Sequence, residues 1–156
     1  MKIELKSIKY SAFMSEETNA FEATVYVDGV KAGRASNRGH GDPINIYPYD
    51  LQVKLDEYGS TLPKTHYHGM ELKQDAESLI NDVLSDWLIA QDLKKRLSSR
   101  IIFAKGKEIR QTKVLAKDRI AQLIKSPDAL APFQADKILN VLPFAEALTI
   151  YKELAA

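Results

Sequence analysis

Three histidines carry the side chains best suited to bind a metal ion or to transfer a proton near neutral pH. His40 lies in the glycine-rich stretch 37–43, and His66 and His68 lie in a second loop that reads His-Tyr-His-Gly. If the two loops meet, His40, Asp42, His66 and His68 would supply a zinc site with water at an open position. No His-Glu-x-x-His motif accompanies them, so histidines that pack beside loop tyrosines are the alternative.

Other patterns that could support catalysis are incomplete. Glu16 and Glu17 stand side by side without a partner constellation, which favours a solvated turn or a helix cap. The glycine-rich stretch is not followed by Gly-Lys-Ser or Gly-Lys-Thr and lies outside any βαβ unit, so it matches no phosphate-binding fingerprint. Ser36 and Ser60 lack the Gly-x-Ser-x-Gly context of a hydrolase nucleophile. The sequence therefore favours a binding protein over an enzyme.

The strongest signal is the distribution of charge. The formal net charge is +1, yet residues 94–125 hold eleven basic and two acidic side chains, while residues 1–93 carry −6 and residues 126–156 carry −2. Basic side chains gathered in one segment are typical of a surface that binds phosphate. The candidate nucleic-acid-binding or partner-binding residues are Lys94, Lys95, Arg96, Arg100, Lys105, Lys107, Arg110 and Lys113.

Two other interpretations of this basic segment stay open. Its cations could pair with the chain's own carboxylates, or they could dock an acidic protein surface. Phe103 is the only aromatic residue in the segment and is expected in the core. Stacking of single-stranded bases on this segment is therefore weakly supported.

The elements that must position these residues begin with strands. Charged and apolar residues alternate over 2–10, which indicates a strand with one wet face, and residues 11–19 indicate a loop. Residues 21–27 and 30–36 predict two further strands. Asp28-Gly29 between them is typical of a two-residue hairpin turn, because Gly tolerates positive φ.

The middle of the chain predicts helices. A short helix is expected over 49–58 and a loop over 65–69. Apolar residues then recur at three- and four-residue steps over 72–97, with acidic residues early and Lys94, Lys95 and Arg96 last, as the helix macrodipole favours. This long helix is expected to lie across the sheet and to bury Trp87 in the core.

The last third predicts two strands and three helices. The strands span 100–104 and 108–114, with a turn at 105–107, and the helices span 116–125, 128–142 and 144–154. The order indicates an α+β fold, with a mostly antiparallel sheet of about five strands packed by one long amphipathic helix and followed by C-terminal helices. We expect an α+β domain over 1–115 and a helical C-terminal extension or small subdomain over 116–156.

Composition limits the class of protein. Apolar residues make up 45% and charged residues 28%, both near the globular average, and no apolar run approaches the roughly 20 residues that cross a bilayer. The start lacks a secretory hydrophobic region, and the absence of cysteine excludes disulfides, thiolate metal sites and cysteine nucleophiles. These features predict a soluble cytoplasmic protein without membrane partners.

Two stretches in the first third of the chain form a distinctive pattern. They are residues 10–29, which include Ser15-Glu16-Glu17 and the Asp28-Gly29 hairpin, and residues 36–41, which end in Gly-His-Gly. With this pattern the first third of the chain resembles a family of small proteins encoded by bacteriophages and plasmids. The resemblance implies an origin in a mobile element of a bacterium, whose accessory proteins often bind host machinery such as defence systems. No activity and no site residue follow from it.

We expect a non-enzymatic protein of the bacterial cytoplasm that engages nucleic acid or a host protein through the basic segment. The alternative is a small metal-dependent hydrolase or ligand-binding protein that uses His40, His66 and His68, with zinc as the cofactor. A homo-oligomer formed through the C-terminal helices is a further possibility, because their apolar stripe could serve as a partner-binding face.

Overall fold

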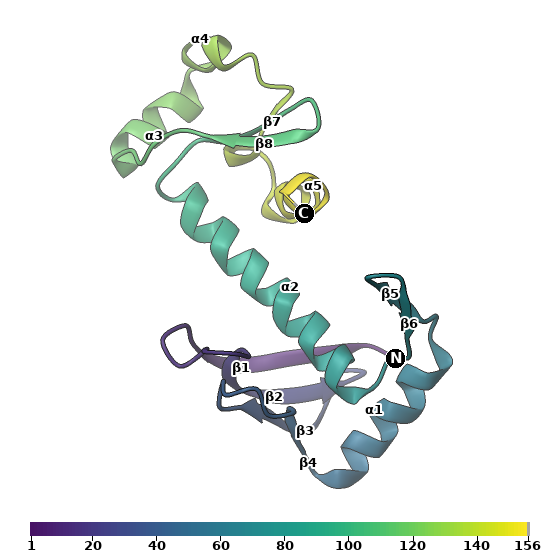
Figure 1. The fold of residues 1–156 in the computed structure, drawn as a ribbon. Coiled ribbons are helices and arrows are strands. Elements are labelled where there is room, and N and C mark those ends of the chain that lie inside the picture. Colours follow the sequence, from purple (N-terminus) through teal and green to yellow (C-terminus); the bar gives the residue numbers. More distant parts are fainter. Residues whose placement is uncertain (156) are drawn as a thin grey trace. The chain divides into compact units, whose positions relative to one another are not determined.

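The computed structural model describes residues 1–155, except for the side chain of Pro127. Mixed helices and antiparallel sheets confirm the α+β class, and the long helix packs against a sheet as expected. The strands are distributed over three sheets of four, two and three strands. The chain forms two compact units, Met1–Asp86 and the part that starts at Trp87 (Figure 1). We call them the N-terminal unit and the C-terminal unit and describe each separately.

The N-terminal unit is built on a four-stranded antiparallel sheet in the order β1-β2-β3-β4. Its strands are β1 (Ile3–Ser11), β2 (Ala20–Val27), β3 (Val30–Asn37) and the short β4 (Asn45–Tyr47). The Asp28-Gly29 hairpin is confirmed, since both residues have positive φ, 49° and 81°, and Val27 pairs with Val30. The first three strands follow the predicted ranges, and β4 adds an edge strand beside β3.

One face of this sheet forms the core of the unit. Phe21, Ala23, Val25 and Val27 are buried at alternate positions of β2, as one face of a strand requires. The N-terminal part of α2 (Ala76–Leu97) lies over the sheet, and α1 (Tyr49–Thr61) packs beside β4 (Figure 1). Side chains reinforce this packing, because Asp56 accepts a hydrogen bond from the Ala76 N–H at 2.8 Å and Glu77 accepts one from the Ile44 N–H at 3.2 Å.

The long helix begins later than its apolar pattern suggested. Residues 72–75 lie outside it, and Asp75 accepts a hydrogen bond from the Ser78 N–H at 2.8 Å while the Asp75 N–H donates to the Ser78 hydroxyl. This reciprocal cap fixes the start of the helix at Ala76. Upstream, the expected loop contains a small hairpin of β5 (Thr65–Tyr67) and β6 (Met70–Leu72).

The apolar stripe of α2 contributes to two cores. Ile80 and Leu84 are fully buried in the N-terminal unit, and Leu93 is fully buried in the C-terminal unit. Trp87, which was expected in the core, is only partly buried. It lies along the helix between the residues that belong to the two cores.

The C-terminal unit has a three-stranded sheet in the order β8-β7-β9 that is covered on both faces. The strands are β7 (Ile102–Lys105), β8 (Glu108–Gln111) and β9 (Lys137–Ile138). On one face Phe103 clusters with Ile120 and Leu123 of α3 (Lys117–Lys125). On the other face Ile102 clusters with Leu93 of α2 and with α5 (Phe144–Ala155).

The prediction of one α-helix over 128–142 is wrong. The α-helical part is limited to α4 (Pro127–Leu130), and two short 3₁₀ helices, η1 (Ala131–Phe133) and η2 (Leu139–Val141), flank β9. Proline inside η1 cannot donate an N–H to a continuing helix, and Gln134 takes the left-handed φ of 50° that ends the turn. The chain then pairs with β7, where Phe103 opposes Ile138.

The compact units divide between Asp86 and Trp87, whereas the sequence suggested a boundary near residue 115. Both core clusters of the C-terminal unit contain residues from each side of that position. Ile101 and Phe103 pack with Ile120, and Ile102 packs with Leu139. The β7–β8 hairpin therefore shares its cores with the helices that follow it.

The described helices were also compared with the requirements of a membrane span. None of them combines the length and the apolar character that such a span needs.

Candidate nucleic-acid interface

The two units carry opposite charge. Residues 87–155 hold thirteen basic and seven acidic side chains, which gives a formal charge of +6. Residues 1–86 hold nine basic and fourteen acidic side chains, which gives −5. The positive charge predicted from the sequence therefore belongs to one folded unit rather than to a stretch of chain alone.

The β7–β8 hairpin, the segment that follows it and α3 carry seven cations, which we call together the hairpin–α3 surface. Two of its members lie on the α3 side of the hairpin. The Phe103 ring packs against α3, Arg110 pairs with Phe103, and Lys105 follows Phe103 by two residues on β7 and so points to the same face. Directly opposed residues of antiparallel strands point to the same face. The members are Lys105, Lys107, Arg110, Lys113, Lys117, Arg119 and Lys125.

Most of these cations are unpaired. Arg110 lies 3.3 Å from Glu108, and both side chains are more than half exposed, so the pair contributes little. Among residues 1–155, none of the other six side chains of the hairpin–α3 surface has a carboxylate oxygen within 4.0 Å. All six are exposed except Lys105, which is half-buried. Their charge is therefore available to a partner.

The remaining predicted residues lie at the end of α2. Lys94 places its Nζ 5.2 Å from the centre of the Phe144 ring, and Arg96 donates to Asp92 at 2.7 Å and to Gln111 at 3.0 Å. Lys95 is exposed and Arg100 is half-buried. Cations in the last turn stabilise a helix through its macrodipole. A role in the fold thus accounts for Lys94 and Arg96.

The eight predicted residues do not share one face. Gln111, which holds Arg96, opposes Ile102 in the hairpin and lies on the α5 side. Lys105 and Arg110 lie on the α3 side. Helix α3 also carries Lys117, Arg119 and Lys125, which belong to the basic segment but are not among the eight predicted site residues. Because successive positions of an α-helix turn by about 100°, Lys117 and Arg119 lie on opposite flanks of the buried Ile120.

Asp92 joins three elements on the α5 side. Its Oδ2 accepts hydrogen bonds from the Arg96 Nε at 2.7 Å and from the Tyr151 hydroxyl at 3.1 Å, so it connects α2 with α5. Arg96 also donates to Gln111, which extends the connection to β8. Burial and then the hydrogen bond to Asp92 raise the pKa of Tyr151 above its ordinary value. The hydrogen bond to Asp92 also raises the pKa of Arg96. The fold therefore favours the protonated tyrosine and the charged arginine.

This junction predicts a pH dependence of stability. Because the pKa of Tyr151 is higher in the folded protein than in the unfolded chain, its contribution is complete below pH 10 and is lost as the pH rises through the folded value. We expect Tyr151→Phe to lower the free energy of unfolding by about 1 kcal/mol at pH 8, as for a single hydrogen bond. Urea unfolding at pH 8 to 11 should show this difference shrinking above pH 10. A difference that stays constant to pH 11 would contradict the assignment.

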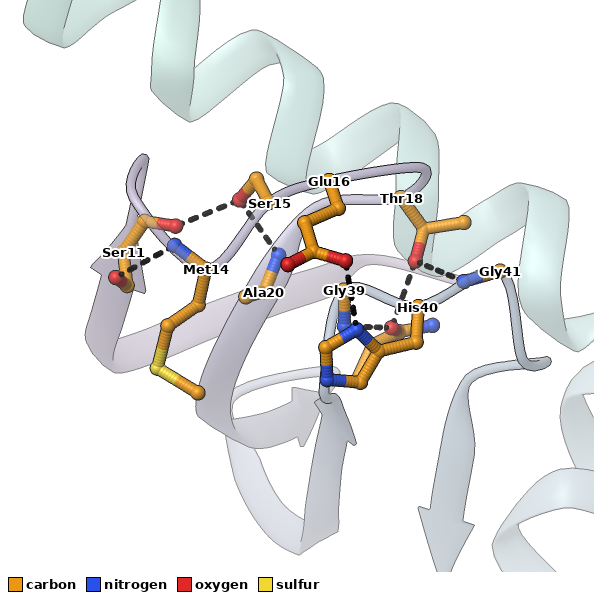
Figure 2. Close-up of polar contacts among 10 residues, drawn as sticks. Ser11, Met14, Ser15, Glu16, Thr18, Ala20, Gly39, His40 and Gly41 are labelled. Carbon is orange, nitrogen blue, oxygen red and sulfur yellow. Dashed lines mark hydrogen bonds and ion pairs between the residues drawn. The ribbon is translucent and has the colours of Figure 1, made fainter.

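The histidine loop of the N-terminal unit is organised by backbone hydrogen bonds. The Gly39 carbonyl accepts from the N–H groups of Glu16, Glu17 and Thr18, and Asn37 accepts from the Gly39 N–H at 2.7 Å. Figure 2 shows this loop against residues 11–20, with the His40 ring turned toward Glu16. The His40 Nδ1 and the Glu16 Oε2 are 3.3 Å apart, and both side chains are more than half exposed.

The other two histidines lie in the β5–β6 hairpin. His66 opposes Glu71, and His68 and Gly69 form the two-residue turn with φ of 48° and 79°. The His68 ring stacks edge-on against Tyr67, with 4.3 Å between the ring centres. No three His, Cys, Asp or Glu side chains in the described part of the chain are placed to hold a metal ion. The predicted site of His40, His66 and His68 is therefore not assembled.

The acidic pair Glu16–Glu17 lies in a fixed loop. The Ser15 hydroxyl donates to the Ser11 carbonyl at 2.6 Å and accepts from the Ala20 N–H at 2.8 Å (Figure 2). Thr18 donates to Asn37 at 2.8 Å and so connects this loop to the histidine loop. Glu16 thus lies beside His40 at the exposed side of this loop.

Comparisons with protein-family models, with curated proteins and with solved structures find no match to this chain.

Proposed function

We propose that the protein is a non-enzymatic nucleic-acid-binding protein whose hairpin–α3 surface contacts the phosphate backbone. The observation that carries the proposal is a set of six unpaired cations within a unit of charge +6. Lys105 is on β7, Lys107 and Lys113 lie just before and after β8, and the other three, Lys117, Arg119 and Lys125, are on α3. Lys and Arg that neutralise phosphates release condensed counterions, which supplies binding energy without base recognition. Such a role needs exposure and charge and requires no catalytic group.

The shape of this surface favours a duplex. Phe103 is buried and stacks on Phe133 with 5.3 Å between ring centres, so no aromatic side chain of the hairpin–α3 surface is free to stack on bases. Helix α3 buries Ile120 and Leu123 and exposes Lys117, Gln122 and Lys125 together with the carboxylate of Asp118. An exposed polar helix face of this kind fits the major groove of B-DNA.

A host protein with an acidic surface is the alternative partner, and we propose the bacterial cytoplasm as the location in both cases. The dependence of binding on salt separates the two cases. Binding to phosphate weakens steeply between 50 and 200 mM salt, since each neutralised phosphate releases counterions.

The proposal predicts the salt dependence of a double variant. For Lys113→Ala/Lys117→Ala, we expect the slope of log K against log salt concentration for a duplex to decrease by about 1.8, or about 0.9 for each lost phosphate contact. Fluorescence anisotropy of the full chain with a labelled 20-base-pair DNA measures this slope. The control is Lys54→Ala/Lys73→Ala, which removes the same charge from exposed positions of the N-terminal unit. Equal slopes for the two variants would reject the hairpin–α3 surface as the contact.

A further inference from the structure

The sheet of the N-terminal unit has a second, outer face, which lies opposite the face that carries Phe21, Ala23, Val25 and Val27. Cross-strand pairing arranges this outer face in rows that run from β1 to β4. One row consists of Lys6, Thr24, Arg34 and Tyr47. The next row consists of Lys9, Glu22, Ser36 and Asn45. Most of these side chains are exposed, and none is buried.

The outer face reverses the charge of its unit. It carries four cations, Lys6, Lys9, Lys31 and Arg34, against the two carboxylates of Glu4 and Glu22. The unit as a whole has a charge of −5. None of the four cations has a carboxylate oxygen within 4.0 Å among the described residues. A net positive face on an acidic unit selects for an anionic partner.

Two tyrosines lie on the same face. Tyr47 is 65% exposed and occupies the row of Arg34. Tyr26 is half-buried, and the Lys6 Nζ lies 4.2 Å above the centre of its ring. The face thus combines cations with one accessible aromatic ring, that of Tyr47, a combination that the hairpin–α3 surface lacks. Aromatic rings beside cations form the platform on which successive unpaired bases stack.

The outer face is hollowed along its rows. A hollow of about 350 Å³ is lined by side chains that include Lys9, Arg34, Asn45 and Tyr47. A second hollow, of about 650 Å³, shares Lys9, Glu22 and Asn45 with the first and extends to Arg38 and Asp42 beside the histidine loop. The β-bulge between Lys6 and Lys9, with Ser7 at φ 51°, interrupts the pairing of β1 beside the first hollow. Bulges bend a strand and increase its twist.

We propose that this outer sheet face binds single-stranded nucleic acid. Lys9, Arg34 and Arg38 would contact phosphates, and Tyr47 would stack on a base. Alternate residues of a strand are about 6.8 Å apart, which suits one nucleotide of extended single strand for each row. Duplex DNA keeps its bases inside the stack and offers no base face to this ring. The site is separate from the hairpin–α3 surface and does not depend on it.

The test measures binding of the full chain to labelled dT12 by fluorescence anisotropy. For Lys9→Ala/Tyr47→Ala, we expect the affinity for dT12 to decrease at least tenfold while the affinity for a 20-base-pair duplex changes less than twofold. The matched control is Lys54→Ala/Tyr49→Ala, which removes one lysine and one tyrosine from exposed positions of α1 and should leave dT12 binding unchanged.

A second variant shows whether a loss of dT12 binding is due only to a local change of structure at Tyr47. Lys9→Ala/Arg34→Ala keeps both tyrosines, and circular dichroism checks that each variant is folded. An affinity for dT12 that is unchanged in both variants, or lowered equally in the control, would overturn the proposal. Failure of dT12 to bind the wild-type chain at 100 μM would also overturn it. Binding of the 20-base-pair duplex to Lys113→Ala/Lys117→Ala tests the hairpin–α3 surface separately.

Discussion

Replacing Gly39 by alanine is expected to lower the free energy of unfolding by about 4 kcal/mol, because two costs add. Gly39 has φ of +90°, where an L side chain is strained. A Cβ on this residue would also overlap the carbonyl oxygen of Met14 and lie 3.1 Å from the Cβ of Ala20. The same residue accepts three N–H groups through its carbonyl oxygen, so a shift of its backbone releases residues 16–18.

The control separates strain from overlap. Gly29 has a similar φ of +81°, but a Cβ there would meet no atom within 4 Å. Gly29→Ala should therefore cost only about 1–2 kcal/mol, the cost of the left-handed conformation. Urea unfolding followed by circular dichroism measures both variants. Equal destabilisation by the two substitutions would show that the contact between Gly39 and Met14 does not restrain the loop.

Asn140→Ala is expected to lower the free energy of unfolding by about 3 kcal/mol, because it leaves several partly buried backbone groups without partners. The Asn140 Oδ1 accepts a hydrogen bond from the Ile102 N–H at 2.8 Å. Its Nδ2 donates to the carbonyl oxygens of Arg100 at 2.8 Å and Leu97 at 3.2 Å. One amide side chain thus fixes the end of α2 and the start of β7 relative to η2.

Two further substitutions define this effect. Asn140→Asp keeps the acceptor but turns a carboxylate toward two carbonyl oxygens, so it should destabilise the protein at least as much as alanine. Asn45→Ala, at an exposed position without a described side-chain hydrogen bond, should change the free energy of unfolding by less than about 0.5 kcal/mol. Urea unfolding measures all three variants. A loss below about 0.5 kcal/mol for Asn140→Ala would contradict the role of this side chain.

Elements whose signals are local were predicted well. The Asp28-Gly29 turn is confirmed because positive φ at both positions is a property of those two residues and their neighbours. In residues 21–27, buried side chains alternate with exposed or half-buried ones, and the periodic stripe of residues 76–97 forms a helix, because each pattern repeats with the period of its element. The charge of the C-terminal unit could likewise be read from the chain.

Elements that depend on a distant partner were missed. Strands β4 and β9 have three and two residues, too few for a periodic signal, and they exist because β3 and β7 offer them edges. Residues 128–142 have the apolar spacing of a helix, but pairing of Ile138 with Phe103 and the hydrogen bonds of Asn140 hold them in another conformation. Tertiary contacts outweigh helix propensity at these positions.

The two candidate surfaces also combine features that the sequence predicts with features that depend on distant partners. The amino-acid order was sufficient to locate the basic segment and its lack of free aromatic rings, since these are matters of residue type. It could not tell which face each cation occupies. Lys6 and Lys9 are three residues apart, and strict alternation would place them on opposite faces of β1. The bulge between them, which arises from pairing with β2, brings both to the outer face beside Arg34 and Tyr47. A shift of one residue in the register of a strand turns every side chain over, and the register is set by the partner strand.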